Sequence, residues 1–568
     1  MKELFVGPLI ALGLLDLFLV WLISKVVKLR SGSQMPAAEN SESNLTKMVY
    51  IFTVVAGIAG LTFRLYGFNR SLWLDEFGTL WAVEGSFSQL LERVDAFQGQ
   101  SAFYYLLAWI FVHSIGESEF TLRVLSLILG LATIYGIYVL GDFLHGKNVG
   151  LVSASLLCLS SSMVQSSSEA RPYALALLMA VIMFYGFARA ARRGDYVGRC
   201  LFILGGAGLF SAHYVLILVV TGIALGYILF PRLRSYYPVR QFAFDASLQL
   251  LFVSWCLPHM FGLWSRRESL SWLGSTNYLV FVALIGPFVV LALAPYMSGN
   301  QPVNSHFQRA MTWVFALAIS VQIGSLHLLA YFGTNLLHAR YMIVAVIPAA
   351  VLAATAVVRL PRYLVPLPLG YWLFCVAAFF IIDFKVYGSF SGVGFQDWRK
   401  AVACLDDFML TEPETLVLYR SGFVEEDTLI NGQTTPATVS PLRSPGRQPV
   451  SWNLIELTYS WVKPGREAYF ARTVEPAVQR APVFYFITCA GCFNQITGQY
   501  PDALVAWIEK TFPGRFQTES IPGIRGVTLI RFVSRFTVPV SESLENTPVP
   551  SFYSTTFGVH PSPHRRCS

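Results

Sequence analysis

The chain has 568 residues, of which 54% are hydrophobic and only 13% are charged, and its mean hydropathy is +0.53. That much apolar surface cannot be hidden in one aqueous core, so the composition excludes a soluble globular protein and indicates a polytopic membrane protein. The net charge of +8 does not indicate a nucleic-acid binder, because the Lys and Arg residues stand in short clusters between apolar runs. In those positions they act as topology signals.

The first apolar run covers residues 4–24. A basic cluster follows it directly: Lys25, Lys28 and Arg30. A cleaved signal peptide carries its positive charge before the apolar run and small residues after it, so we expect residues 1–30 to form a retained, additional transmembrane helix with its N-terminus outside. The polar segment 31–46 then reads as a cytoplasmic linker.

We expect the main transmembrane domain to cover residues 47–382, with a first external loop at 68–118. Two amphipathic stretches of that loop, 75–94 and 101–115, carry aromatic residues on one side and are too short or too polar to span, which predicts interfacial helices. With the N-terminal helix, the predicted spans make an α-helical polytopic fold of about twelve transmembrane helices. After 4–24 they lie at about 47–67, 119–141, 149–165, 173–190, 199–213, 214–230, 241–262, 277–297, 310–331, 340–358 and 363–382.

Positive charge supports this path through the membrane. If the 68–118 loop is external, every predicted cytoplasmic turn is basic, as orientation by Lys and Arg requires. The basic residues of these turns are Lys25, Lys28, Arg30, Lys147, Arg192, Arg193, Arg199, Arg232, Arg234, Arg240, Arg309, Arg359 and Arg362. The external side then gathers chemically useful residues from distant parts of the sequence, which an active site requires. They are Asp75, Glu76, Glu169, Arg171, Trp264–Ser271 and His338–Tyr341.

The composition becomes mixed after residue 382. A helix opening at Asp397, a second helix at Asp502–Phe512 and several short apolar runs predict a small extracytoplasmic α/β domain over 383–540. The runs read as strands are Thr415–Tyr419, Val483–Ile487 and Val527–Phe532. Ser and Pro dominate the tail, 541–568, which we expect to be disordered.

The adjacent acids Asp75 and Glu76 stand among aromatic residues just after the second span. Two interpretations are open from these residues alone. Carboxylates stabilise the start of a helix, so the pair could cap an interfacial helix. An acid at the membrane surface could instead accept a proton as a general base.

Four motifs, taken in order, resemble the GT-C glycosyltransferases. They are Arg70–Glu76 (RSLWLDE), Gln100–Leu107 (QSAFYYLL), Gly116–Ser126 (GESEFTLRVLS) and Glu169–Leu175 (EARPYAL). The sequence is most similar to the bacterial branch related to protein O-mannosyltransferases and to the enzymes that add aminoarabinose or galacturonic acid to lipid A. His338-Ala-Arg340-Tyr341 and Asp397-Trp-Arg resemble later landmarks of that branch, so the likeness covers about residues 50–400.

The resemblance implies a transfer from a polyprenyl-phosphate sugar, with Asp75 as catalytic base and Glu76 as its partner. It also implies that Arg123, Arg171 and Arg340 contact the donor phosphate; without it, an Arg at a helix end is equally well read as snorkelling to the interface. A divalent metal held by Asp75 and Glu169 is an alternative that the sequence leaves open. Further residues of the motifs are expected to bind substrate: Gln100, Tyr104, Tyr105, Glu169, Tyr173, His338 and Tyr341.

One motif departs from the family pattern. Members often have His-Pro-Pro before the aromatic pair, where this chain has Gln100-Ser101-Ala102. The departure puts the start of the second amphipathic helix in doubt, together with any role of that His. Gln100 keeps the ability to donate a hydrogen bond.

Two other residue types have weaker signals. His213, His259 and His327 lie in or near spans with no zinc spacing, so we interpret them as packing residues. Cys489-Ala-Gly-Cys492 has a thioredoxin-like spacing, but no helix clearly follows it, and we expect a local disulfide rather than redox chemistry. Cysteines in the apolar segments are read as small hydrophobic residues: Cys158, Cys200, Cys256 and Cys375.

The sequence therefore predicts an inverting glycosyltransferase in a bacterial inner (plasma) membrane of the cell envelope, with its catalytic face and C-terminal domain outside. The acceptor is a hydroxyl of a lipid, glycan or protein; sugar, acceptor and oligomeric state are not specified by the residues. A transporter or lipid flippase would use the same charges along a pathway, but would show inverted repeats and charges near mid-bilayer. A non-catalytic sensor is the other alternative.

Overall fold

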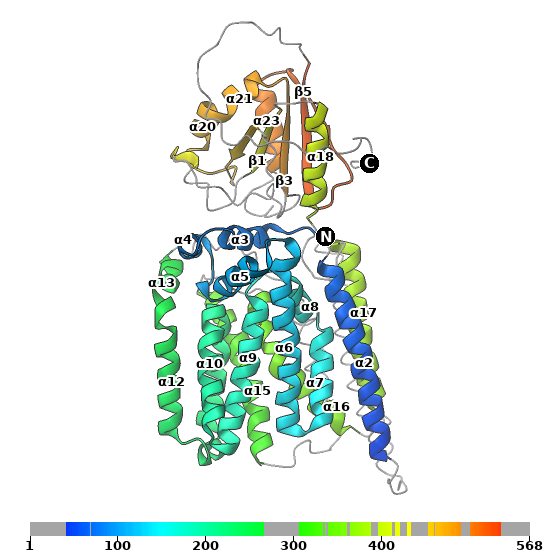
Figure 1. Cartoon of the computed structure of the whole chain (residues 1–568), viewed down its shortest axis with the longest axis vertical. Helices are drawn as coiled ribbons and strands as arrows, with labels where there is room; N and C mark the ends of the chain where they lie inside the picture. Colours follow the sequence, from blue (N-terminus) through cyan, green and yellow to red (C-terminus); the bar gives the residue numbers. More distant parts are fainter. Residues whose placement is uncertain are drawn as a thin grey trace. The chain divides into compact units, whose positions relative to one another are not determined.

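The computed structural model divides the chain into two compact units (Figure 1). The first, here called the membrane unit, contains Met1–Asn69, Ala82–Gly116 and Phe120–Val393. The second unit contains Arg70–Trp81, Glu117–Glu119 and Gly394–Ser568. The structure describes residues 41–68, 70–265, 306–332, 336, 339–360, 364–387, 396–411, 415–420, 429–432, 453–458, 460–489 and 500–535. The predicted helices at 4–24 and 277–297 and the tail 541–568 lie outside these residues.

The membrane unit is helical. Within the described residues, six helices are long and apolar enough to cross a membrane, or seven if one bent pair counts as a span. The six candidate spans are Leu45–Phe68, Glu119–His145, Tyr173–Arg193, Val239–Trp264, His306–Tyr331 and Arg340–Arg359. The chain is thus an integral membrane protein, and the predicted helical polytopic fold is confirmed.

The helices of this unit follow the apolar runs of the sequence. In chain order they are α2 (Ser41–Phe68), α4 (Phe87–Phe97), α5 (Ala102–Ile115), α6 (Glu119–His145), α7 (Lys147–Leu159), α8 (Ser161–Ser168), α9 (Tyr173–Arg193), α10 (Tyr196–Ala212), η1 (Tyr214–Ile217), α11 (Leu218–Leu229), η2 (Pro231–Ser235), α12 (Val239–Val253), η3 (Ser254–Cys256), α13 (Leu257–Ser265), α15 (His306–Tyr331), η5 (Ala339–Ala345), α16 (Val346–Arg359) and α17 (Pro366–Tyr387).

The stretch predicted as one interfacial helix at 75–94 is two helices. Helix α3 covers Leu74–Val83, and α4 begins after Ser86. Ser86 and Gln89 form a reciprocal capping box, in which each side chain accepts a hydrogen bond from the other residue's backbone N–H. This box satisfies the first donors of α4 and fixes the break.

One predicted span is also broken. The run at 149–165 forms α7 and α8, which meet at an angle of 65°. Ser160 lies at the bend, where its hydroxyl donates to the Leu157 carbonyl and accepts from the Met163 N–H. The predicted pair around residue 213 is confirmed as short helices, with the chain breaking at His213 between α10 and η1.

Helices α9 and α10 approach closely because small residues line their contact. A Cβ added at Gly186 would lie 2.3 Å from the backbone nitrogen of Phe202, and one at Gly205 would lie 2.4 Å from that of Met183. Close backbone approach through small residues is the usual way that membrane helices associate without a hydrophobic driving force.

An ion pair joins α10 to α12. The Arg199 guanidinium donates two hydrogen bonds, of 2.8 and 2.7 Å, to the two carboxylate oxygens of Asp245, which is fully buried. The Tyr237 hydroxyl donates a third, of 2.6 Å, to the same carboxylate. The buried carboxylate is thereby compensated by the partly buried guanidinium, as a charged group inside a membrane domain needs to be.

The second unit contains a five-stranded mixed sheet in the order β2-β1-β3-β5-β4 (Figure 1). Strand β1 pairs in parallel with β2 and β3, and β5 pairs antiparallel with β3 and β4. The predicted small α/β domain is confirmed by this sheet. Its elements are α18 (Trp398–Thr411), β1 (Leu416–Arg420), β2 (Asn453–Leu457), α20 (Arg466–Tyr469), η7 (Phe470–Val474), α21 (Glu475–Arg480), β3 (Val483–Cys489), α23 (Tyr500–Thr511), β4 (Phe516–Ser520) and β5 (Val527–Ser534).

The Arg199–Asp245 pair gives a stability prediction. Asp245→Asn removes the negative charge and leaves the Arg199 guanidinium without its counter-ion, which costs about 3 kcal/mol or more when the pair is buried. We expect a clear fall in the Tm of the purified protein in detergent. Ser247→Ala on the exposed side of the same helix serves as the control and should leave the Tm unchanged. Equal Tm values for the two variants would show that the pair does not hold α10 to α12.

Candidate functional site

The two acids of the first motif lie in the first turn of α3 and have different surroundings. Glu76 is fully buried, and its carboxylate accepts the backbone N–H of Trp73 at 3.3 Å. An acid three residues into a helix that reaches back to the N-cap N–H is one half of a capping box. Asp75 is only half-buried. Glu76 therefore has a structural role in starting α3, while the Asp75 side chain is placed at the positive end of that helix.

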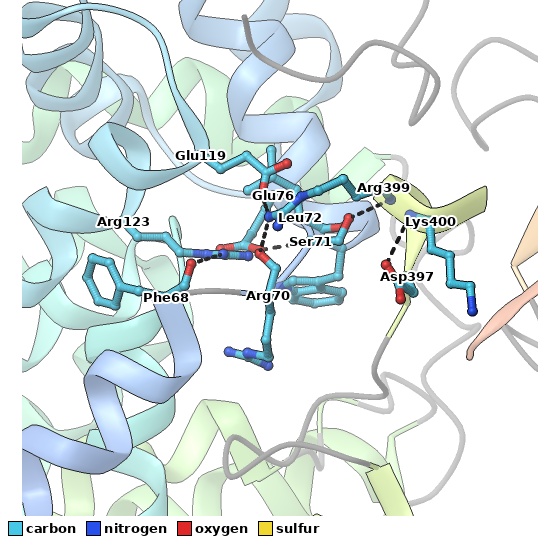
Figure 2. Close-up of polar contacts among 11 residues, drawn as sticks. Phe68, Arg70, Ser71, Leu72, Glu76, Glu119, Arg123, Asp397, Arg399 and Lys400 are labelled. Carbon is cyan, nitrogen blue, oxygen red and sulfur yellow. Dashed lines mark hydrogen bonds and ion pairs between the residues drawn. The ribbon is translucent and has the colours of Figure 1, made fainter. Parts of the chain in front are cut away.

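The segment that carries Asp75 is hydrogen-bonded to the start of α18, within the second unit (Figure 2). The Gln396 side-chain oxygen accepts the N–H of Leu74, the first residue of α3, at 3.3 Å. Arg399 donates to the Glu119 carboxylate at 2.5 Å and to the Arg70 carbonyl at 3.3 Å. These contacts join residues about 300 positions apart in sequence, and nothing in the local sequence pattern predicts them.

Two predicted residues lie on or beside α6, in the membrane unit. Arg123 is fully buried and donates to the Phe68 carbonyl at the end of α2, at 3.2 Å (Figure 2). The hydroxyl of Tyr104, on α5, lies 3.1 Å from that of Ser126 on α6. Arg123 thus satisfies a carbonyl at a helix end, where backbone acceptors lack partners.

Tyr105 joins Arg171 to two glutamines. The oxygen of the buried Tyr105 hydroxyl lies 2.7 Å from the side-chain oxygen of Gln98 and 3.0 Å from that of Gln100, so its one proton is shared between these two acceptors, and it accepts from the Arg171 guanidinium at 3.4 Å. Arg171 is 8% exposed. The structure therefore brings together three of the predicted residues: Gln100, Tyr105 and Arg171. The hydrogen bonds give the tyrosine ring one fixed position and hold a guanidinium beside it.

Glu169 and Arg171 form the turn between α8 and α9. Glu169 is 1% exposed and its carboxylate accepts a 3.0 Å hydrogen bond from Gln165. The backbone N–H of Arg171 donates to the Glu169 carbonyl at 2.8 Å. Pro172 then precedes the first residue of α9, a position where its fixed φ suits helix initiation.

A second group of side chains surrounds His213. The ring of Tyr173 stacks on the imidazole at 5.5 Å between centroids, and that of Tyr341 lies 5.2 Å away at 58°. The Arg340 guanidinium lies over the Tyr173 ring at 5.9 Å. Three predicted residues, Tyr173, Arg340 and Tyr341, are thus gathered around a histidine that the sequence analysis interpreted as a packing residue.

The predicted residues divide between the two units. Asp75 and Glu76 belong to the second unit, and the other described ones belong to the membrane unit. His338 lies outside the described residues. Within the residues that the structure describes, no three His, Cys, Asp or Glu side chains form a group that could hold a metal ion.

The sequence analysis missed a second buried cation. Arg64 on α2 is fully buried and donates to the hydroxyl of Ser167 at 2.8 Å and to the carbonyls of Gly60 and Cys158 at 2.7 and 3.0 Å. These bonds fix α2 against the α7–α8 bend. An Arg inside an apolar run was the available signal, since charged residues inside membrane segments are rare.

The cysteines of the second unit differ from those of the membrane unit. Cys404 on α18 and Cys489 on β3 are both disulfide-bonded. Cys158, Cys200, Cys256 and Cys375 are thiols outside any disulfide. Cys492, expected to pair locally with Cys489, lies outside the described residues. Disulfides persist in oxidising compartments.

Residues 100–261 match the family model described as dolichyl-phosphate-mannose-protein mannosyltransferase. A search of curated proteins finds no match to the chain. Among solved structures, the chain is similar to ArnT from Cupriavidus metallidurans bound to undecaprenyl phosphate, with 13% identity and a TM-score of 0.46. It is also similar to the same protein in the apo state, with 15% identity and a TM-score of 0.48. Each comparison covers 86% of this chain and 98% of the other. The match over residues 100–261 confirms the predicted resemblance to the GT-C superfamily of glycosyltransferases.

Proposed function

We propose that this protein is an inverting glycosyltransferase that moves a sugar from a polyprenyl-phosphate donor to a hydroxyl acceptor at the outer face of the membrane. The observation that carries the proposal is the buried polar group around Tyr105 and Arg171. It lies inside the segment that matches a family acting on a polyprenyl-phosphate sugar. A guanidinium held beside a tyrosine hydroxyl in an apolar setting is well suited to bind a phosphate.

The membrane unit would bind the donor. Arg340 lies over the Tyr173 ring, Arg171 lies beside the Tyr105 hydroxyl, and Arg123 is buried on α6. A phosphate leaving group gains negative charge as its bond to the sugar breaks. Fixed guanidinium groups stabilise that charge without reorganisation, which is the usual largest contribution to such a reaction.

Asp75 would act as the general base. In the proposed step, the acceptor oxygen forms a bond to the anomeric carbon from the face opposite the phosphate. The bond between that carbon and the phosphate oxygen breaks, and the acceptor proton passes to the Asp75 carboxylate. The products are the inverted glycoside and a polyprenyl phosphate. Glu76 serves this step by fixing the first turn of α3 through Trp73.

The second unit would hold the base in position. The first backbone N–H groups of a helix have no hydrogen-bond partner inside that helix. The N–H of Leu74, the first residue of α3, donates to the side-chain oxygen of Gln396, which lies just before α18. The disulfide-bonded Cys404 lies on the same helix, α18, which agrees with an extracytoplasmic location. The C-terminal part of the chain is thus proposed to be a component of the catalytic apparatus rather than a separate acceptor-binding module.

Asp75→Asn tests the base. With labelled polyprenyl-phosphate sugars and a panel of acceptors in lipid nanodiscs, we expect wild type to transfer label and the variant to lose a factor of about 10² to 10⁴ in kcat. Donor binding should be unchanged. Asp95→Asn, an exposed acid in the same predicted external loop, is the matched control. No transfer by wild type would favour the transporter alternative, and full activity of Asp75→Asn would exclude this residue as the base.

Arg171→Met tests the phosphate site. Loss of one charge-assisted contact to a phosphate should weaken the binding of bare polyprenyl phosphate about tenfold or more. The measurement is lipid binding by the protein in nanodiscs. Arg193→Met changes an exposed Arg at the C-terminal end of α9, the helix that follows Arg171, and should bind as wild type does. Unchanged affinity in Arg171→Met would remove Arg171 from the donor site.

Gln396→Ala tests the positioning role of the second unit. Loss of the acceptor for the Leu74 N–H at a helix N-terminus costs about 1 kcal/mol, so we expect kcat to fall about fivefold while the KM for the donor stays constant. The same oxygen also accepts the Trp398 indole N–H at 2.9 Å, so the Tm of the variant is measured alongside to separate a loss of stability from a loss of positioning. Lys400→Ala is the control. It changes the residue next to Arg399 on α18 and keeps the backbone N–H that Lys400 donates to Asp397. An equal rise in KM with unchanged kcat would show that Gln396 acts on substrate binding instead.

A further inference from the structure

His213 is a buried side chain whose ring nitrogens are not satisfied by the protein. The residue is 3% exposed. Its backbone is fully used: the N–H donates to the Leu209 carbonyl at the end of α10, and the carbonyl accepts the N–H of Leu216 in η1. Neither Nδ1 nor Nε2 has a hydrogen-bond partner within the part of the chain that the structure describes.

Two buried nitrogens without partners are costly. Each unsatisfied polar atom disfavours the folded state by about 1 to 3 kcal/mol, and nearly all such atoms in folded proteins find a partner. If His213 only filled space between Tyr173 and Tyr341, a phenylalanine would fill it without this cost. No described residue supplies that partner, so we take it to be a bound ligand.

The neighbours of His213 indicate what that partner is. The charge of Arg171 acts directly on the imidazole, and the Tyr173 ring that stacks on the imidazole also carries the Arg340 guanidinium on its face. Two of the three cations that the proposed function assigns to the donor phosphate are thus neighbours of His213 or of the ring stacked on it. A ligand whose phosphate these cations bind would have its adjoining group near His213.

The chemistry of the ring narrows the choice further. A neutral imidazole offers one N–H donor and one acceptor nitrogen. A phosphate oxygen accepts hydrogen bonds only, so it would leave the acceptor nitrogen unsatisfied. A sugar hydroxyl both donates and accepts, and the apolar faces of Tyr173 and Tyr341 suit the C–H faces of a pyranose. Hydroxyls of a saccharide can therefore accept from the imidazole N–H and donate to its other nitrogen.

We propose that His213 binds the sugar of the polyprenyl-phosphate donor through its ring hydroxyls, and so contributes to the choice of sugar. The inference rests on the proposed function, because it takes the ligand of Arg171 and Arg340 to be a sugar phosphate. The inference gives the residues of one site two different roles. The guanidinium groups address the phosphate that all donors share, and His213 addresses the part in which donors differ.

The test compares two ligands in one variant. His213→Phe keeps an aromatic ring between the two tyrosines and removes both nitrogens. The probes are bare dolichyl phosphate and dolichyl phosphates carrying mannose, glucose, galacturonic acid or aminoarabinose, bound to protein in nanodiscs. We expect the variant to lose about tenfold in affinity for the sugar-bearing lipids that wild type prefers, and to bind bare dolichyl phosphate as wild type does.

Two further variants keep the result interpretable. His213→Gln restores a donor and an acceptor and should recover part of the lost affinity. His113→Phe changes an exposed histidine on α5 and should have no effect. The Tm of His213→Phe should equal or exceed that of wild type, because the unsatisfied nitrogens are gone.

The other outcomes contradict the inference. Equal losses for bare and sugar-bearing lipids would assign His213 to the phosphate or to the fold. Unchanged affinity for all lipids would mean that the nitrogens hold ordered water. If wild type binds no sugar-bearing lipid more tightly than the bare one, there is no sugar site at His213. Failure of the proposed function is seen separately, as absence of label transfer by wild type.

Discussion

Lipid offers no hydrogen bonds, so each place where a membrane helix breaks must find partners for its backbone inside the protein. At the breaks in this chain, polar side chains supply the missing hydrogen-bond partners of the backbone. The hydroxyl of Ser160 serves both sides of the α7–α8 bend. Arg123 satisfies a carbonyl at the end of α2. The candidate site follows from these breaks, because Arg171 and His213 lie where one helix stops and the next begins.

The elements that could be predicted are those with a strong local signal. Long apolar runs identify the spans, and the buried central strands β1, β3 and β5 are short apolar runs bounded by polar residues. Strands β2 and β4 were missed because they are partly exposed and polar at the sheet edges, as Phe516–Ser520 shows with four exposed residues out of five. The bend at Ser160 coincides with the run Ser160-Ser161-Ser162, but apolar Met163 and Val164 follow it, so the stretch was read as one span. The break at Ser86 had a signal in the Ser-x-x-Gln capping box.

The candidate site was predictable residue by residue but not as a set of contacts. Motif order identified Tyr105, Arg171 and Tyr173, and the structure joins them to partners on other helices. His213 was interpreted as a packing residue because its spacing fits no zinc signature, whereas the proposed sugar contact rests on its unsatisfied ring nitrogens. The proposed role of His213 depends on its two ring nitrogens lacking hydrogen-bond partners among the described residues, and no sequence pattern indicates such a lack. The contact of Arg399 with Glu119 spans 280 positions and leaves no trace in either local pattern.

The second unit is assembled from three separate pieces of the chain, at 70–81, 117–119 and from 394 onward. During synthesis its first piece leaves the ribosome more than 300 residues before the strands that complete it. The segment bearing Asp75 must therefore wait, through the insertion of the later helices, for a partner that is made last. Contacts of such long sequence separation form slowly, because the chain loses the entropy of closing a large loop before the contacts stabilise it. A chain cut short before α18 would keep its membrane helices and lack the surroundings of its own acidic motif.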